Sequence, residues 1–392
     1  MSIHSEHFGK TQAGEIVRSW KLSSPELSSS GGMSIELLDY GASIRSVRWH
    51  DREICCALNS LEAYERQTAY MGAVCGRFSN RIANSRFTLN GKTHNLYPND
   101  PPHSLHGGRK GFARSVWNTE PIHGGTEHSG TEHSGTGLRF YRYSPDGEDG
   151  YPGNLRVEVE YHLIENRHIE DQRIEDQQGA ILVIYYRAEC DAPTPVNLTN
   201  HAYWNLEGED RGHINNHTFT IAADKYVDVD SSRIPTGLLA DADGPMDLRK
   251  AVSLSGRLGS GAELPEGFDH CYAVNADAPL LQHTEWGSDV LEKLDRKIVR
   301  CALNARCAAR ARVPESGHCM EIYTDYPGIQ FYTGCFLNEK NGRNNLHYQP
   351  FSAFCFETQF FPDSPNQREF PNTILHPGEL YEKITIHRFM AD

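Results

Sequence analysis

One carboxylate, Glu357, interrupts an apolar run that ends in a Pro-Asp-Ser-Pro-Asn turn. The run has the composition of a strand, and alternate side chains along a strand share a face. Glu357 is therefore expected on the face of Ala353 and Cys355, opposite Phe354 and Phe356. Small and aromatic neighbours exclude water from a carboxylate, which raises its pKa and lets it accept a proton near neutral pH. The alternative is a glutamate at a strand end that points into water, as most acidic side chains do.

A second unusual stretch, 195–206, sets a single histidine among asparagines, Tyr203 and Trp204. Aromatic faces stack on the C–H faces of sugar rings, while the tyrosine hydroxyl and the indole N–H supply polar contacts. His201 is a candidate acid or base because the ordinary pKa of histidine is near neutrality. The alternative is a core histidine with both ring nitrogens hydrogen-bonded.

Arginine and asparagine gather in the glycine-rich stretch 72–111, where Asn80 and Arg81 are neighbours. Glycine lets a ligand approach the backbone closely. A guanidinium fork beside an amide that both donates and accepts is suited to sugar hydroxyls or carboxylates. The alternative is that Arg77 and Arg81 are structural ion-pair partners. A further carboxylate, Asp269, stands beside two ring side chains.

The elements that must position these residues are short strands separated by turn residues. The stretch 155–163 alternates between apolar and polar residues most cleanly, and 180–189 follows it as another strand. Such strands recur from end to end, which predicts an all-β fold, a large antiparallel β-sandwich with few short helices.

No break in composition divides the chain, so we expect a single domain over 1–392. Three segments are predicted to be insertions in loops, near 123–137, 165–178 and 278–304. The last is expected to be peripheral and to hold one helix, with Asp289 and Glu292 as N-cap and N3 residues. Its apolar face is predicted to contain Leu291, Leu294, Ile298 and Cys301.

Composition excludes several classes of function. The formal charge of −14 argues against a nucleic-acid partner, which requires a basic face. The mean hydropathy is −0.58 and no apolar run approaches a membrane span, so no membrane partner is expected. With no secretory pattern, we expect a cytoplasmic protein whose ten cysteines are reduced thiols. Serine-hydrolase and nucleotide-binding motifs are absent, and the two Thr-Glu-His-Ser-Gly repeats match no standard metal spacing.

Taken in order, six motifs resemble the aldose 1-epimerase (galactose mutarotase) family from about Gly72 to the C-terminus. They are Gly76-Arg-Phe-Ser-Asn-Arg-Ile82, Leu105-His-Gly-Gly108, Thr199-Asn-His-Ala-Tyr-Trp-Asn-Leu206, Phe268-Asp-His270, Pro327-Gly-Ile-Gln-Phe-Tyr-Thr-Gly334 and Phe356-Glu-Thr-Gln-Phe-Phe-Pro-Asp-Ser-Pro-Asn366. The resemblance implies a galactose mutarotase-like supersandwich with a sugar cleft on one sheet, and neither a metal nor an organic cofactor. It also implies an isomerase that interconverts the α and β anomers of free aldohexoses such as D-galactose and D-glucose.

The resemblance implies a role for each matched residue. Glu357 is expected to be the general base and His201 the general acid, on opposite sides of the anomeric carbon. His106 is expected near the ring oxygen and the C1 hydroxyl. The remaining sugar-hydroxyl ligands are expected to be Asn80, Arg81, Asp269 and Gln330. The three insertions overlap none of the motifs, and we expect a monomer or a weak homodimer.

Two other functions fit the residues less well. A related epimerase for hexose 6-phosphates would need additional basic groups at the cleft mouth to hold the phosphate. A non-catalytic sugar-binding or regulatory protein on the same fold is the second alternative, since a fold does not determine a function. A metal site in the His-Glu repeat is a distant third.

Overall fold

The computed structural model describes residues 2–391 except 24–31, 123–135, 167–178, 260–263 and 265. The predicted insertions near 123–137 and 165–178 therefore lie mostly outside the described residues. Among the described residues, no helix is long and apolar enough to cross a membrane.

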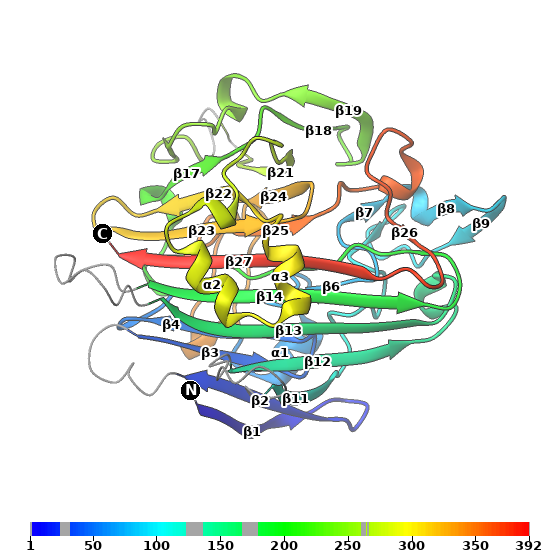
Figure 1. Cartoon of the computed structure of the whole chain (residues 1–392), viewed down its shortest axis with the longest axis horizontal. Coiled ribbons are helices and arrows are strands. Elements are labelled where there is room, and N and C mark those ends of the chain that lie inside the picture. The colour runs from blue at the N-terminus through cyan, green and yellow to red at the C-terminus, as the bar shows by residue number, and fades with distance from the viewer. Residues whose placement is uncertain are drawn as a thin grey trace.

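The largest sheet has nine strands, and every neighbouring pair in it is antiparallel (Figure 1). In spatial order they are β11 (Asn118–Ile122), β12 (Thr136–Ser144), β13 (Leu155–Asn166), β14 (Gly179–Cys190), β27 (Tyr381–Ala391), β23 (His318–Thr324), β22 (Arg306–Arg312), β17 (Thr218–Ile221) and β20 (Val252–Ser253). The strands predicted at 155–163 and 180–189 are confirmed as β13 and β14.

Two five-stranded sheets form the other layer. The N-terminal sheet contains β1 (Ser2–Lys10), β2 (Ile16–Ser23), β3 (Met33–Leu38), β4 (Ser43–Trp49) and β5 (Arg52–Glu53). The second has the order β19 (Pro235–Asp241), β18 (Lys225–Val229), β21 (Asp269–Ala273), β24 (Gly328–Tyr332) and β25 (Cys355–Gln359). Four further sheets are short antiparallel pairs: β6 (Val74–Cys75) with β16 (Thr199–Asn200), β7 (Arg81–Ile82) with β10 (Ser104–Leu105), β8 (Arg86–Leu89) with β9 (Lys92–Asn95), and β15 (Thr194–Pro195) with β26 (Ile374–Leu375).

The main core lies between the nine-stranded sheet and the two smaller sheets. Alternate residues of β13, such as Val157 and Val159, join Leu37 of β3 and Ile329 of β24 in one buried cluster. Burying one apolar face per sheet is the driving force for this arrangement. The expectation of a large antiparallel β-sandwich is confirmed.

The insertion near 278–304 differs from its prediction. It holds two short helices, α2 (Gly287–Lys293) and α3 (Arg296–Ala302), and not one helix capped by Asp289. The helix stops at Leu294, whose backbone is extended, and Asp295 then caps α3 by accepting the Lys297 N–H at 3.1 Å. Capping carboxylates satisfy backbone donors that the first helical turn leaves free.

The two helices lie over β14 and β27 on the outer face of the nine-stranded sheet (Figure 1). Their predicted apolar residues Leu294, Ile298 and Cys301 are buried there against the sheet. This packing explains why β14 is apolar on both faces, since its outward residues would otherwise contact water. A shorter helix, α1 (Leu61–Arg66), is capped by the side chain of Ser60.

Candidate active site

Three neighbouring strands, β21, β24 and β25, present polar side chains on one face. Gln330 of β24 is directly opposite Glu357 of β25, and Asp269 of β21 is opposite Tyr332. The amide Nε2 of Gln330 donates to Oδ1 of Asp269 at 2.8 Å. Sheet register alone therefore brings together three residues that are spread over almost ninety positions of the chain.

The alternation predicted for β25 is observed. Phe354 and Phe356 belong to the main core, whereas Cys355 points to the other side, toward His201. Glu357 shares that side and is only 2% exposed, so the interpretation of a glutamate pointing into water is wrong. A strand buried on both faces has placed an ionisable group where water is scarce.

His201 follows directly after β16 and is held there by its backbone. Its N–H donates to the carbonyl of Ala73 at 2.9 Å, and its own carbonyl accepts the N–H of Gly72 at 2.9 Å. The ring Nδ1 lies 3.5 Å from Cys355 Sγ, and Nε2 lies 3.6 Å from Glu357 Oε1. One ring nitrogen thus contacts a buried thiol while the other points to the carboxylate.

Glu357 and His201 are side by side on one wall, which differs from the expectation of opposite sides. A gap of 3.6 Å between Oε1 and Nε2 leaves no space for a sugar ring between them. Both groups must therefore approach a ligand from the same direction. Two oxygens bonded to one carbon are close enough for such a pair to contact one oxygen each.

Burial controls the protonation of this pair. Burial raises the pKa of the Glu357 carboxyl well above its usual value, Asp269 raises it further, and Arg81 opposes the shift. Burial lowers the pKa of His201 to about 4. Among the described residues Glu357 Oε2 has no hydrogen-bond partner, so the carboxylate retains an acceptor for a ligand. Both shifts favour a neutral pair, in which Glu357 holds a proton that it can transfer to His201.

His106 is fixed by a reciprocal contact with Asn80. The backbone N–H of Asn80 donates to His106 Nδ1 at 3.1 Å, and the N–H of His106 donates to the carbonyl of Asn80 at 3.1 Å. Because Nδ1 accepts, a neutral ring must have its proton on Nε2. Burial keeps the ring neutral by lowering the pKa of His106 well below its usual value. The ring lies edge-on to His201, with centroids 5.3 Å apart, and Nε2 is left as a donor.

The position of the His106 proton on Nε2 also affects whether the site can bind a metal ion. His106, His201 and Glu357 offer nitrogen and oxygen atoms within 4.8 Å of one another, close enough to surround a cation. A metal ligand needs an unprotonated nitrogen, but the nitrogen of His106 that remains free of Asn80 bears the proton. The arrangement fits a ligand that accepts hydrogen bonds better than it fits a metal ion.

Asn80 and Arg81 complete the polar wall. The Asn80 amide donates to Gln330 Oε1 at 3.2 Å and accepts the Arg81 N–H at 2.8 Å. Arg81 Nε pairs with Asp100 Oδ2 at 2.9 Å. Arg77 is instead structural, since its buried guanidinium donates to the carbonyls of Ser144, Pro145, Pro152 and Gly153.

A cavity of about 350 Å³ receives all seven residues that the sequence predicted for the site. Tyr203, which the sequence analysis considered as an aromatic sugar contact, also lines it, whereas Trp204 of the same stretch lies in the main core. Other lining residues were not assigned to the site from the sequence: Tyr70, Tyr332 and the rim segment 336–339. Tyr332 could have been found, because it is two residues from Gln330 on one strand and so shares its face. No pattern in the sequence points to the rim segment.

Known proteins were compared with the chain and its fold. A model of the aldose 1-epimerase family matches residues 24–388. Galactose mutarotase of Mus musculus is 37% identical over 401 residues, covering 99% of both chains. Aldose 1-epimerase of Escherichia coli (strain K12) is 33% identical over 378 residues, covering 93% of this chain and 94% of the relative. A solved galactose 1-epimerase from Lactobacillus acidophilus, at 22% identity, has the same fold with a TM-score of 0.76 over 100% of this chain and 99% of its own. With the motifs, the sandwich and this cavity in agreement, the chain belongs to the aldose 1-epimerase family and is an isomerase.

Proposed function

We propose that the protein interconverts the α and β anomers of free aldohexoses such as D-galactose and D-glucose, with Glu357 as general base and His201 as general acid. The observation that carries this proposal is the 3.6 Å separation of Glu357 Oε1 and His201 Nε2 on the wall of a polar cavity. We also propose that residues 1–392 act as one domain.

The reaction moves two protons and breaks one bond. Glu357 removes the proton from the C1 hydroxyl while His201 gives a proton to the ring oxygen, and the C1–O5 bond breaks. The product is an open-chain aldehyde whose C1–C2 bond can rotate. Closure on the other face returns the first proton from Glu357 to O1 and the second from O5 to His201. Each positioned proton transfer contributes roughly 10²–10⁴ in rate.

The ion pair that the reaction requires differs from the neutral pair only by the transfer of one proton from Glu357 to His201. The two forms hold the same number of protons, so no proton has to enter or leave the cavity between them. A sugar hydroxyl that donates to the free Oε2 of Glu357 stabilises the charged carboxylate. Substrate binding is thus expected to convert the neutral pair of Glu357 and His201 into the ion pair.

The other polar residues would hold the sugar while C1 changes configuration. The Asp269 carboxylate can accept two adjacent hydroxyls, and it is already oriented by Gln330 and by Arg233 at 3.3 Å. His106 Nε2–H would donate to an oxygen of the anomeric centre. Hydrogen-bonding sites of this kind discriminate strongly against analogues that lack the hydroxyl.

Optical rotation tests the proposal directly. Fresh single-anomer sugars are added to the protein, and the approach to anomeric equilibrium is compared with the spontaneous rate. Acceleration is expected for α-D-galactose or α-D-glucose and not for methyl α-D-glucoside, which has no C1 hydroxyl to deprotonate. If no free hexose in a broad panel reacts faster than the blank, the proposed function is wrong.

Glucose 6-phosphate provides a second comparison in the same assay. Arg81 is the one lysine or arginine among the described residues that line the cavity, and it already pairs with Asp100. A phosphate would therefore have few cations to bind. We expect free hexoses to be turned over with a higher kcat/KM than the phosphate ester.

A further inference from the structure

Part of the rim of the cavity belongs to a segment, 337–348, that folds back on itself. Leu337, Asn338 and Glu339 line the cavity. Glu339 then pairs with Tyr348 in an antiparallel bridge, in which each N–H donates to the other's carbonyl at 2.9 Å. We call residues 337–348 the rim loop. Its backbone also pairs with the segment 57–59, through Asn59 N–H to the carbonyl of Asn341 at 2.9 Å and Arg343 N–H to the carbonyl of Ala57 at 2.7 Å. Side-chain contacts outside the loop restrict its backbone further.

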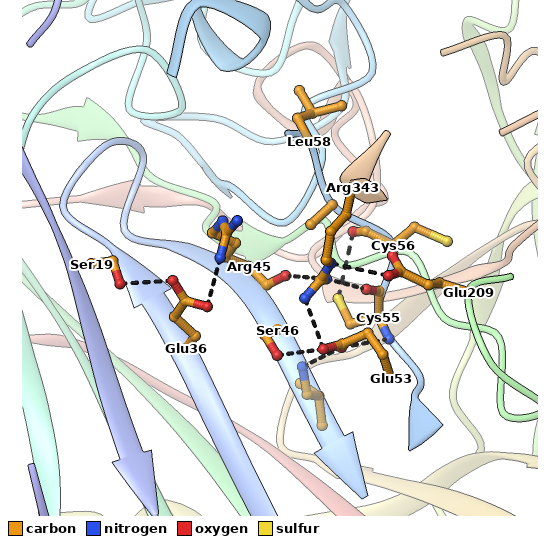
Figure 2. A network of polar contacts seen from close by, with 12 residues as sticks. Ser19, Glu36, Arg45, Ser46, Glu53, Cys55, Cys56, Leu58, Glu209 and Arg343 are labelled. Atoms are coloured by element: carbon orange, nitrogen blue, oxygen red, sulfur yellow. Dashed lines mark hydrogen bonds and ion pairs between the residues drawn. The ribbon is translucent and has the colours of Figure 1, made fainter. Parts of the chain in front are cut away.

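Arg343 lies in the middle of the rim loop, is not among the residues that line the cavity, and supplies such contacts (Figure 2). Its Nη1 donates to Glu53 Oε2 at 2.8 Å, and its Nε lies 3.0 Å from Glu209 Oε1. Its Nη2 donates to the carbonyls of Arg45 at 2.7 Å and Cys55 at 2.9 Å. One guanidinium therefore connects the rim loop to β4, to the segment after β5 and to the segment that contains Glu209.

The partners of Arg343 are themselves held firmly. Glu53 accepts from Ser46 Oγ at 2.5 Å and from the Val47 N–H at 2.8 Å. The hydroxyl of Tyr348, a rim-loop residue, donates to Glu209 Oε2 at 2.5 Å. The two carboxylate oxygens of Glu209 thus contact Arg343 and Tyr348, one each. A shift of either rim-loop side chain would therefore displace the other through Glu209.

Charge and burial make this arrangement specific for arginine. The side chains of Arg343 and Glu53 are only 14% and 13% exposed, so their ion pair is poorly screened by water. Two carboxylates with a single cation need a fork of donors, which lysine does not have. Removing the guanidinium would leave two buried carboxylates without their common partner.

We propose that Arg343 is a positioning residue for sugar binding, because it clamps the rim loop to the N-terminal sheet and so fixes the rim of the cavity. The inference rests on the proposed function, since it takes the cavity to be the sugar site. In the part of the chain that the structure describes, neither Glu357 nor His201 has a hydrogen bond or ion pair with Arg343, Glu53 or Glu209. The clamp should therefore affect binding and leave the chemical step intact.

The test compares Arg343→Met with Arg45→Met in the polarimetric assay. Arg45 and Glu36 form an ion pair of 2.6 Å with 17% and 18% exposure in the neighbouring strands, a close match to the Arg343–Glu53 pair (Figure 2). Only the carbonyl of Arg45, which the substitution keeps, contacts Arg343. For Arg343→Met we expect KM to rise on the order of tenfold with kcat within about twofold, and for Arg45→Met no comparable change.

Amide hydrogen exchange of the sugar-free protein gives a readout that does not depend on activity. Exchange of the Glu339 and Tyr348 amides should accelerate in Arg343→Met and remain near the native rate in Arg45→Met. If the native protein showed no mutarotation but exchange changed as expected, the proposed function would fail while the clamp would stand. The proposed role of Arg343 would be wrong if amides of the rim loop exchanged at the native rate in Arg343→Met, or if this variant lost kcat at constant KM. If Arg343→Met does not fold, Arg343→Lys replaces it in both measurements. An unchanged KM in Arg343→Lys would also contradict the proposed role of Arg343.

Discussion

The Glu357 carboxylate is the residue on which the proposed chemistry depends most. Glu357→Gln keeps the shape of the side chain and removes its basicity, so the variant should still bind sugar while kcat falls roughly 10²–10⁴-fold. Calorimetric titration and polarimetry measure the two effects separately. Glu160→Gln is a suitable control, because Glu160 is similarly buried but pairs with His162 and Lys297 away from the cavity. Near-normal turnover by Glu357→Gln would place the base elsewhere.

Cys355 contacts the proposed acid, and this contact can be tested by a single-atom change. In the proposed cycle His201 exchanges a proton with Glu357 at Nε2, so the proton on Nδ1 stays in place and this N–H donates to Cys355 Sγ, 3.5 Å away. Burial keeps the thiol itself protonated by raising its pKa well above the usual value. Cys355→Ala should reduce kcat by roughly 2- to 10-fold at constant KM, the size of one modest hydrogen bond. Cys355→Ser should restore most of the activity. Cys56→Ala, which removes an equally buried thiol, is the control; equal kcat in both alanine variants would deny Cys355 a role.

At the scale of elements, the proposed function has β21 and β24 hold the sugar through Asp269 and Gln330, which are hydrogen-bonded to each other. Asp269→Ala removes a hydroxyl acceptor and also the acceptor that orients Gln330. KM should therefore rise roughly 10- to 100-fold, as expected for losing a hydrogen bond to a charged group, with a smaller effect on kcat. Asp269→Asn, which keeps one acceptor oxygen, should lie between the alanine variant and the native protein. A native KM in Asp269→Ala would remove Asp269 from the list of sugar ligands.

Strands with a clear alternation of apolar and polar residues could be predicted from the sequence, but the contacts that these strands make across the fold could not. Alternation in β25 correctly placed Glu357 beside Cys355 and opposite the phenylalanines, because side-chain direction along a strand is a local property. The helix at 289–301 was predicted as one piece because its apolar spacing continues across Leu294, whereas the structure breaks there to follow the sheet. The rim loop has no period, so its place at the cavity could not be predicted. That place depends on contacts with residues distant in sequence, namely the ion pairs of Arg343 and the backbone hydrogen bonds to 57–59.

At the scale of the whole molecule, the site should cost stability in a way that depends on pH. The folded pKa of Glu357 is raised, so the native state retains a proton that the unfolded chain releases above about pH 4.5. The free energy of unfolding should then fall relative to Glu357→Gln by at most about 1.4 kcal/mol per pH unit as pH rises toward the folded pKa. Urea unfolding at several pH values measures the difference.

Glu160 provides a control of opposite sign for this experiment. Burial would raise its pKa, but hydrogen bonds from His162 and Lys297 outweigh burial and lower the pKa to about 2. Its ionised form therefore stabilises the fold above the unfolded pKa, and that stability is lost only as pH falls toward 2. Glu160→Gln should be less stable than the native protein at neutral pH. A stability difference between Glu357→Gln and native that does not vary with pH would contradict the prediction.

The helical pair α2 and α3 has a consequence for how this chain can change in evolution. It shields outward apolar residues of β14 and β27, among them Ile181, Val183, Ile384 and Ile386. A descendant that lost both helices would expose these side chains as a contiguous hydrophobic patch and would tend to aggregate. Deletion of the insertion is therefore tolerable only together with polar replacements on β14 and β27, which are far from it in sequence. The presence of the two helices and the hydropathy of the outward residues on those strands should therefore change together in evolution.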